Sequence, residues 1–177
     1  VPLANRLGMG TLKWELEDMS FSYLNPSAYK TIQVEIIGKR EDREKHVAYL
    51  ISYIKTLLKS QDIEGTIEGR PKHFYSIYRK MVKKNMALSS IYDMFGLRII
   101  AKDIRQCYEI LGAIHGDLKP MAHRIKDYIA MPKANMYQSL HTTVIGPNGH
   151  RIEIQIRTQE MHQLSEFGIA AHWSYKE

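Results

Sequence analysis

Polar side chains that could do chemistry recur at every second position near the end of the sequence. They alternate there with isoleucines, in the order Arg151, Ile152, Glu153, Ile154, Gln155, Ile156, Arg157. A period of two predicts a β-strand with its isoleucines on one face and its polar residues on the other. A carboxylate can coordinate a metal ion, and an amide and a guanidinium can contact polar groups of a substrate. A sheet with one solvated face would show the same pattern, so both interpretations stay open.

A second carboxylate, Asp93, comes just before another predicted strand, in which apolar residues alternate over 95–99. A carboxylate there could simply cap a turn. Paired with Glu153 on a neighbouring strand, it would instead offer two oxygen ligands for Mg²⁺. The only cysteine, Cys107, lies on the apolar stripe of a predicted helix and is expected to pack there. No Cys/His cluster has zinc spacing, so a hard, oxygen-ligated cation is the only metal that the sequence supports.

The segment GRPKHFYSIYRK at 69–80 carries the side chains best suited to phosphate. Pro71 is tolerated in the first turn of a helix, and a helix from there to about Lys84 is predicted. That register puts a hydroxyl and basic groups on one face: Lys72, Ser76 and Lys80. Near a helix start, such a face would bind a triphosphate, although an ordinary amphipathic surface helix fits too. The sequence has no GxxxxGK[ST] motif, which excludes a P-loop enzyme.

Positive charge is concentrated in the middle of the chain. Residues 70–133 carry 13 lysines and arginines against 5 acidic residues, a surplus of eight that exceeds the net charge of +6 for the whole chain. A basic belt of this kind predicts a polyanionic partner, either nucleotide phosphates or a nucleic-acid backbone. No apolar run approaches the length of a membrane span, so an integral membrane protein is not expected.

Helices and strands alternate along the chain, which favours an α+β (or α/β) domain with a mixed sheet. The predicted helices cover 10–24, a long segment ending in the apolar face of 47–58, 71–84, 104–118 and 158–172. The predicted strands lie between Gly65 and Gly69, over 95–99, and in a hairpin of 141–145 and 151–157 around an Asn-Gly turn. Residues 119–139 are expected to be irregular.

Four long blocks of sequence then carry a specific resemblance: GRPKHFYSIYRKM, IYDMFGLRII, RIKDYIAMPKANMYQSLHTTVIGP and IEIQIRTQEMHQLSEFGIAAHW. Together they resemble the synthetase domain of RelA/SpoT homologues, over about residues 62–175. The N-terminal stretch PLANRLGMGTLKWELEDMSFSYLNP resembles the helical connection that follows the hydrolase domain of long members. The resemblance implies transfer of pyrophosphate from ATP to the 3′-hydroxyl of GDP or GTP.

The resemblance also implies a role for individual positions. Asp93 and Glu153 match the catalytic acidic pair that binds Mg²⁺. The positions that match ATP contacts are Arg70, Lys72, Ser76, Lys80 and Arg98. The positions that match the GDP/GTP side are Arg124, Lys126, Lys133, Asn135, Tyr137, His141 and Gln155. Among these, Tyr137 matches the tyrosine that stacks on guanine, although an aromatic residue there could also pack in the core. Arg124 and Lys126 belong to the RxKD signature of bifunctional synthetase-hydrolases.

The fold that the resemblance implies is nucleotidyltransferase-like, with a mixed sheet of about five strands flanked by helices. Residues 1–61 are then a helical extension and residues 62–177 the synthetase domain, and the chain is expected to be a fragment of a longer cytoplasmic enzyme. Ribosome or tRNA would be reached only through other parts of that enzyme. Two alternatives stay open, a non-catalytic nucleotide- or RNA-binding module and transfer of pyrophosphate to the 3′ end of tRNA.

Overall fold

A five-stranded mixed sheet forms the centre of the protein, in a computed structural model that describes residues 1–38, 40–85 and 95–168. The strands are β1 (Thr66–Pro71), β2 (Phe95–Ala101), β3 (Lys126–Asp127), β4 (Leu140–Ile145) and β5 (Arg151–Thr158). Their order in the sheet is β1-β2-β5-β4-β3. β2 and β5 pair in parallel, and the other neighbours pair antiparallel. The expected mixed sheet of about five strands flanked by helices is therefore confirmed.

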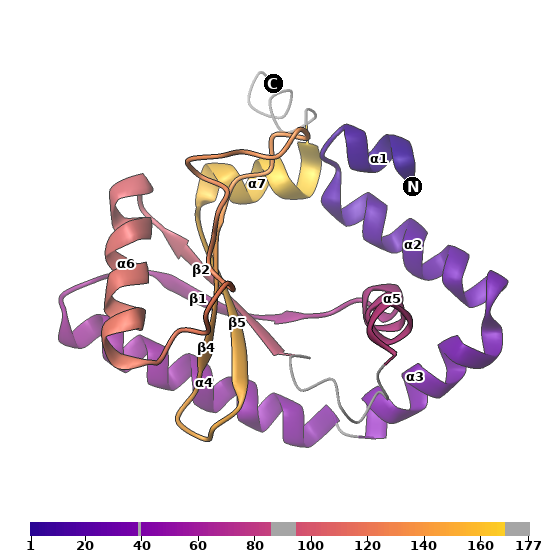
Figure 1. Ribbon diagram of the computed structural model, residues 1–177, viewed down its shortest axis with the longest axis horizontal. Helices are drawn as coiled ribbons and strands as arrows, with labels where there is room; N and C mark the ends of the chain where they lie inside the picture. Colours follow the sequence, from indigo (N-terminus) through magenta and orange to yellow (C-terminus); the bar gives the residue numbers. More distant parts are fainter. Residues whose placement is uncertain (39, 86–94, 169–177) are drawn as a thin grey trace.

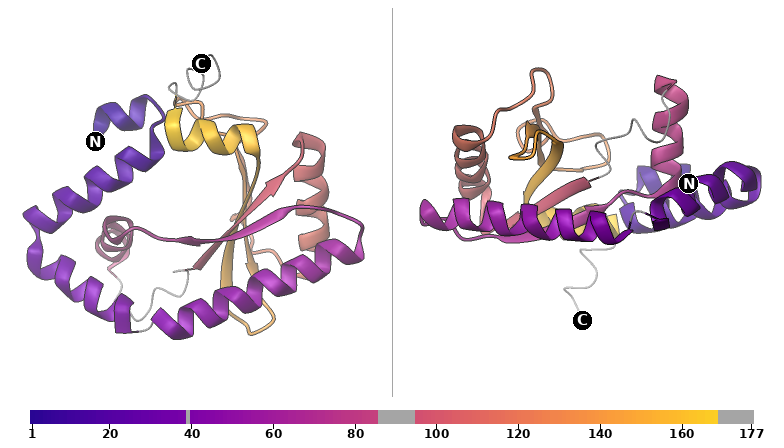
Figure 2. Two further views of the ribbon diagram at one scale, coloured as in Figure 1. Left: turned by 180° about the vertical axis from the view of Figure 1, so that it is seen from behind. Right: turned by 90° about the horizontal axis from the view of Figure 1, so that it is seen from below.

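In the described ranges, helices surround this sheet as an arc of four and three further helices (Figure 1). They are α1 (Pro2–Arg6), α2 (Gly10–Leu24), α3 (Pro26–Gly38), α4 (Arg40–Ser60), α5 (Phe74–Lys84), α6 (Ile104–Asp117) and α7 (Gln159–Phe167). The arc runs from α1 beside α7, through α2 and α3, to α4, which lies along the sheet (Figures 1 and 2). None of the helices in the described ranges is both long and apolar enough to span a membrane.

One face of the sheet, covered by α4 and α6, holds the main hydrophobic core. Alternate residues of β5 point into it, and Ile152, Ile154 and Ile156 are at most 1% exposed. α6 contributes Cys107 and Ile110, both fully buried, so the expected packing role of the cysteine is confirmed. Complete burial of such side chains stabilises the fold by about 1.5–3 kcal/mol each, which makes this face the main source of stability.

The opposite face of the sheet is flanked by α2, α5 and α7 rather than covered by a second apolar layer (Figure 2). A small aromatic cluster joins α2, α3 and α5 around Phe21, Ile32 and Ile77, which are all at most 3% exposed. Phe21 stacks on Tyr78 with their ring centres 4.6 Å apart. This cluster ties α5 to the arc of helices, and so fixes α5 at a distance from the sheet surface.

One of the predicted helices begins later than expected. The helix expected from Pro71 begins at Phe74, because Pro71 pairs with Phe95 as the last residue of the edge strand β1, where a missing N–H is tolerated. The helix predicted over 158–172 is α7 (Gln159–Phe167), with Gly168 as its C-cap, and the positions predicted after Gly168 lie outside the described residues.

The start of α2 packs so closely against the end of α7 that there is no room for a Cβ atom at the contact. A Cβ atom added to Gly10 would overlap the backbone oxygen of Ser165, and one added to Gly168 would overlap the backbone oxygen of Leu7. Gly8 has a φ of +74°, a conformation that glycine adopts without strain. Thr11 adds a hydrogen bond of 2.6 Å from its hydroxyl to Glu166 of α7. Small residues therefore let the N-terminal helices lie directly on the last described helix.

We expect Gly10→Ala to destabilise the protein by about 1–3 kcal/mol, because the added methyl group has no room beside Ser165. Gly112→Ala is the matched control, since a Cβ there meets no atom within 4 Å in the middle of α6. That control should be stabilised by up to about 1 kcal/mol. Denaturant unfolding measures both. A Gly10→Ala protein as stable as the wild type would contradict the close packing of α2 on α7.

Candidate functional site

The polar face of β5 forms the floor of the candidate site. Glu153, Gln155 and Arg157 all line one cavity on the side of the sheet opposite the main core. Neighbouring strands extend this floor, because Gln155 lies opposite Arg98 of β2 and opposite His141 of β4. The predicted alternation of β5 is confirmed. The polar row faces a cavity rather than open solvent.

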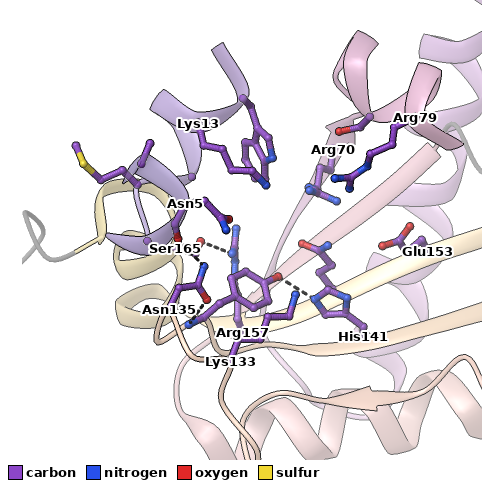
Figure 3. A pocket seen from close by; sticks show the side chains of 18 residues that line it. Asn5, Lys13, Arg70, Arg79, Lys133, Asn135, His141, Glu153, Arg157 and Ser165 are labelled. Carbon is purple, nitrogen blue, oxygen red and sulfur yellow. Dashed lines mark hydrogen bonds between the residues drawn. The ribbon is translucent and has the colours of Figure 1, made fainter. Parts of the chain in front are cut away.

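The cavity has a volume of about 360 Å³ and draws its walls from distant parts of the sequence (Figure 3). It is lined by Ala4, Asn5, Gly8, Met9, Gly10, Lys13, Trp14, Arg70, Ser76, Arg79, Lys133, Asn135, Tyr137, His141, Glu153, Gln155, Arg157 and Ser165. Five of these side chains are lysine or arginine and only one is a carboxylate. Such a balance suits a ligand with several negative charges.

One wall comes from β1 and α5. Arg70 and Ser76 line the cavity, and the Lys72 ammonium lies 3.0 Å from a carboxylate oxygen of Glu153. Lys72 precedes α5, so it does not share a helical face with Ser76 as the sequence predicted. Burial alone would raise the pKa of Glu153, but Lys72 and Arg70 outweigh it and hold the pKa below its ordinary value. The carboxylate is therefore ionised at neutral pH.

The opposite wall comes from the irregular segment before β4 and from β4 itself. Tyr137 lines the cavity, and its hydroxyl lies 2.8 Å from Nε2 of His141. The Lys133 ammonium lies 4.8 Å from the centre of the Tyr137 ring. Asn135 donates a hydrogen bond of 3.3 Å from its amide to the backbone oxygen of Asn5. These contacts hold an aromatic ring, an imidazole and a cation at one end of the cavity.

His141 is neutral in this setting. Burial is the main cause, and with the nearby Lys133, Arg70 and Arg157 it lowers the pKa of His141 to about 4, against the opposing effect of Glu153. A neutral imidazole has one nitrogen that donates and one that accepts, so it can pair with the Tyr137 hydroxyl and with a ligand hydroxyl. His141 is thus suited to hydrogen bonding rather than to carrying charge.

Arg157 in the floor of the cavity and Arg98 on the neighbouring strand share one carboxylate. Glu166 accepts from Nη2 of Arg157 at 3.3 Å and from Nη2 of Arg98 at 3.4 Å. Arg157 is only 1% exposed and also donates to the Ser165 hydroxyl. Burial lowers the pKa of Arg157 to about 10, which still leaves it protonated at neutral pH. The Glu68 carboxylate also lies 3.8 Å from Nη1 of Arg98, so two carboxylates offset these two guanidiniums.

The structure brings eight of the predicted site residues into the cavity lining: Arg70, Ser76, Lys133, Asn135, Tyr137, His141, Glu153 and Gln155. Lys72 forms an ion pair with the lining residue Glu153, and Arg98 lies opposite Gln155 on the neighbouring strand. Asp93 lies outside the described residues. Arg124, Lys126 and Lys80 do not line the cavity, and the first two are exposed.

Several lining residues were not assigned from the sequence. Arg79 follows Ser76 by three positions, and that helical spacing was a usable signal. Arg157 was recognised on the polar face of the strand but given no role. Lys13 and Trp14 carried no signal, because they are more than 50 residues from Arg70 and meet it only through folding.

A model of the family described as "Region found in RelA / SpoT proteins" matches residues 69–177. The chain belongs to the RelA/SpoT family. The resemblance noted in the sequence is thereby confirmed. Among RelA/SpoT relatives, the chain is 49% identical over 176 residues to the "Bifunctional (p)ppGpp synthase/hydrolase RelA" of Mycobacterium tuberculosis. It is 48% identical over the same length to the "GTP pyrophosphokinase" of Streptomyces antibioticus.

Each of these matches covers 99% of the chain but only 24% and 21% of the two RelA/SpoT relatives. Solved structures are similar as well. The small alarmone synthetase 1 of Bacillus subtilis bound to pppGpp has a TM-score of 0.53 at 27% identity, with 83% of this chain and 82% of that chain covered. A GTP pyrophosphokinase family protein of Streptococcus pneumoniae has a TM-score of 0.54 at 25% identity, with 81% and 76% covered. The nucleotidyltransferase-like fold expected for the RelA/SpoT family is thus confirmed.

We expect the pH dependence of stability to report on His141. Its pKa is about 4 in the folded protein and about 6.5 in an unfolded chain, so the unfolded state binds more protons between these values. The contribution of His141 to the free energy of unfolding is thus complete above about pH 6.5 and is lost as the pH falls towards 4. Chemical unfolding at pH 7 and pH 5 should show a smaller loss for His141→Gln than for the wild type. Equal losses in both proteins would contradict a buried neutral imidazole.

Proposed function

We propose that this chain transfers pyrophosphate from ATP to the 3′-hydroxyl of GDP or GTP, giving AMP and ppGpp or pppGpp. The observation that carries the proposal is the ionised Glu153 on the floor of a basic cavity, between the Arg70–Ser76 wall and the Tyr137–His141 wall. A module that only bound polyanions would gain nothing from a carboxylate in that place. The names of the RelA/SpoT relatives support the same reaction.

ATP is proposed to occupy the wall formed by β1 and α5. Arg70 packs on the adenine, and Lys72, Ser76, Lys80 and Arg98 contact the phosphates. Arg70 and Ser76 line the cavity, and Lys72 forms an ion pair with Glu153 on the cavity floor. Charge-assisted hydrogen bonds from lysine and arginine are the strong contacts to phosphate oxygens.

GDP or GTP is proposed to occupy the opposite wall. Tyr137 stacks on guanine, His141 and Asn135 contact polar groups of the nucleotide, and Lys133 neutralises its phosphates. Gln155 stands between the two nucleotides, because it lies between Arg98 and His141 across three strands. Arg124 and Lys126 are proposed to reach the acceptor from the rim, where both side chains are exposed.

The reaction forms a bond between the 3′-oxygen of the acceptor and the β-phosphorus of ATP, and it breaks the bond from that phosphorus to the oxygen that leaves with AMP. Glu153 is placed to accept the proton of the 3′-hydroxyl. Phosphates of bound ATP compete with Glu153 for Lys72, which loosens the ion pair and makes the carboxylate a stronger base. Positioning and charge neutralisation supply most of the rate in such transfers.

Mg²⁺ is proposed as the cofactor, with Asp93 and Glu153 as its ligands. The chemistry of Glu153 fits, since an ionised carboxylate facing a cavity is a typical Mg²⁺ ligand. The backbone of β2 brings Gly96 beside Glu153, three residues after Asp93. Among the described residues, no group of three or more His, Cys, Asp or Glu side chains could hold a metal. A bound Mg²⁺ would neutralise charge around the transferred group.

The remaining expectations belong to the same proposal. Residues 62–177 form the synthetase domain and residues 1–61 a helical extension, in a cytoplasmic enzyme. Ribosome or tRNA contacts would come from other parts of that enzyme.

The direct test incubates the protein with Mg²⁺, GDP and ATP labelled in its γ-phosphate, and then separates the products. Equal amounts of AMP and labelled ppGpp are the expected result. Nucleotide binding without AMP formation would instead favour the non-catalytic module. Label found on added tRNA but not on GDP would favour the tRNA acceptor.

Glu153→Gln keeps the shape of the side chain and removes its charge. We expect it to lower ppGpp formation at least ~100-fold, because a lost general base costs about 10²–10⁴ in rate. Glu109→Gln is the control, since Glu109 is a half-exposed carboxylate on α6, paired with Arg105 on the far side of the sheet. Initial rates of both variants are compared at saturating nucleotide. A Glu153→Gln protein with most of the wild-type rate would rule out Glu153 as the general base.

Tyr137→Ala should raise the Kd for GDP about five- to a hundredfold and leave the Kd for ATP nearly unchanged, because base stacking contributes ~1–3 kcal/mol. Tyr137→Phe keeps the ring but loses the contact with His141, so it should retain most of the affinity. Titration calorimetry measures both nucleotides, and melting temperature gives the control. If Tyr137→Ala melted far earlier and bound both nucleotides poorly, the ring would be packing in the fold rather than stacking on guanine.

A further inference from the structure

α2 reaches the cavity with a tryptophan that meets the proposed ATP wall. The ring centre of Trp14 lies 4.9 Å from that of His73, and the two rings are nearly parallel, at 23°. The guanidinium carbon of Arg70 lies 5.3 Å from the Trp14 ring centre. Both Trp14 and Arg70 line the cavity. The family match begins at residue 69, so it assigns nothing to this helix.

The same face of α2 also fixes the start of α5. Asp18, one helical turn after Trp14, accepts hydrogen bonds from the backbone N–H groups of Phe74 at 3.3 Å and Tyr75 at 2.8 Å. Its carboxylate lies 3.6 Å from Nδ1 of His73. His73 is the N-cap position of α5 and makes no side-chain capping bond itself, so Asp18 supplies the cap from another helix. α2 therefore holds the segment between Arg70 and Tyr75 from one side.

At its N-terminal end α2 is fixed to α7, beside the floor of the cavity. Thr11 donates to Glu166, the carboxylate that pairs with Arg157 and Arg98. A rotation of α2 that moved Trp14 would therefore break contacts at both ends. This double attachment holds the indole against Arg70 rather than leaving it free to swing away.

We propose that Trp14 positions Arg70 for the donor nucleotide, so that indole, guanidinium and purine base form a three-layer stack. A guanidinium is planar and has two faces, and an aromatic ring on one face leaves the other for a second ring. Trp14 is thus a positioning residue from outside the matched domain, and it acts on the purine end of ATP rather than on the phosphates. This rests on the proposed placement of ATP beside Arg70.

The test measures Kd values by titration calorimetry for ATP, tripolyphosphate and GDP. Trp14→Ala should raise the Kd for ATP about two- to thirtyfold, the range of a cation–π contact, and change the other two less than about twofold. Tripolyphosphate has the charges of ATP without the base, so it separates stacking from phosphate binding. Trp14→Leu keeps apolar volume without a ring and should lose ATP affinity in the same way, which guards against a folding defect. Tyr23→Ala, an aromatic residue of α2 that is 84% exposed, is the control and should bind like the wild type.

A double-mutant cycle with Arg70→Ala decides whether Trp14 acts through Arg70. In the Arg70→Ala background, Trp14→Ala should change the Kd for ATP less than about twofold. Additive losses, or equal weakening of ATP, tripolyphosphate and GDP with a lower melting temperature, would reduce Trp14 to a packing residue. Failure of the wild type to form ppGpp would overturn the proposed function but not this inference. Normal ATP binding by Trp14→Ala in an active enzyme would overturn only the inference.

Discussion

The side chains of β5 alternate between an apolar core and a charged cavity, and the rest of the structure depends on that alternation. Its isoleucines are at most 1% exposed, which fixes the register of β5 against β2 and β4. A shift by one residue would bury Glu153 and Arg157 in the core and expose the isoleucines. The register that stabilises the fold is therefore the one that presents the carboxylate to the cavity.

Several lysine and arginine side chains lie around one cavity, and carboxylates offset part of their mutual repulsion. Glu153 offsets Lys72, and Glu166 offsets Arg98 and Arg157. The remaining positive charges line the cavity without a matching number of carboxylates. The phosphates of a bound ligand would supply the missing negative charge. α2 connects the two sides of this arrangement, because it contacts Glu166 at one end and the start of α5 at the other.

The strand that forms the cavity floor and its hairpin could be predicted from the sequence, because the patterns that indicate them are local. The period of two in β5 predicted its two faces, and the Asn-Gly turn predicted the hairpin. Pro71 misled the prediction, since a proline suits both a first helical turn and an edge strand, and only the pairing with β2 decides between them. Trp14, Lys13 and Asn5 could not be predicted, because their place in the cavity results from close packing around Gly8 and Gly10.

The central claim is that one cavity holds two nucleotides on opposite walls, and backbone amide NMR shifts test it most directly. A non-hydrolysable ATP analogue should shift the amides of residues 70–80 and the indole N–H of Trp14, while GDP should shift the amides of residues 133–141. Both ligands added together should give both sets of shifts. If the two nucleotides shifted the same amides and displaced one another, the division of the cavity into a donor wall and an acceptor wall would be wrong.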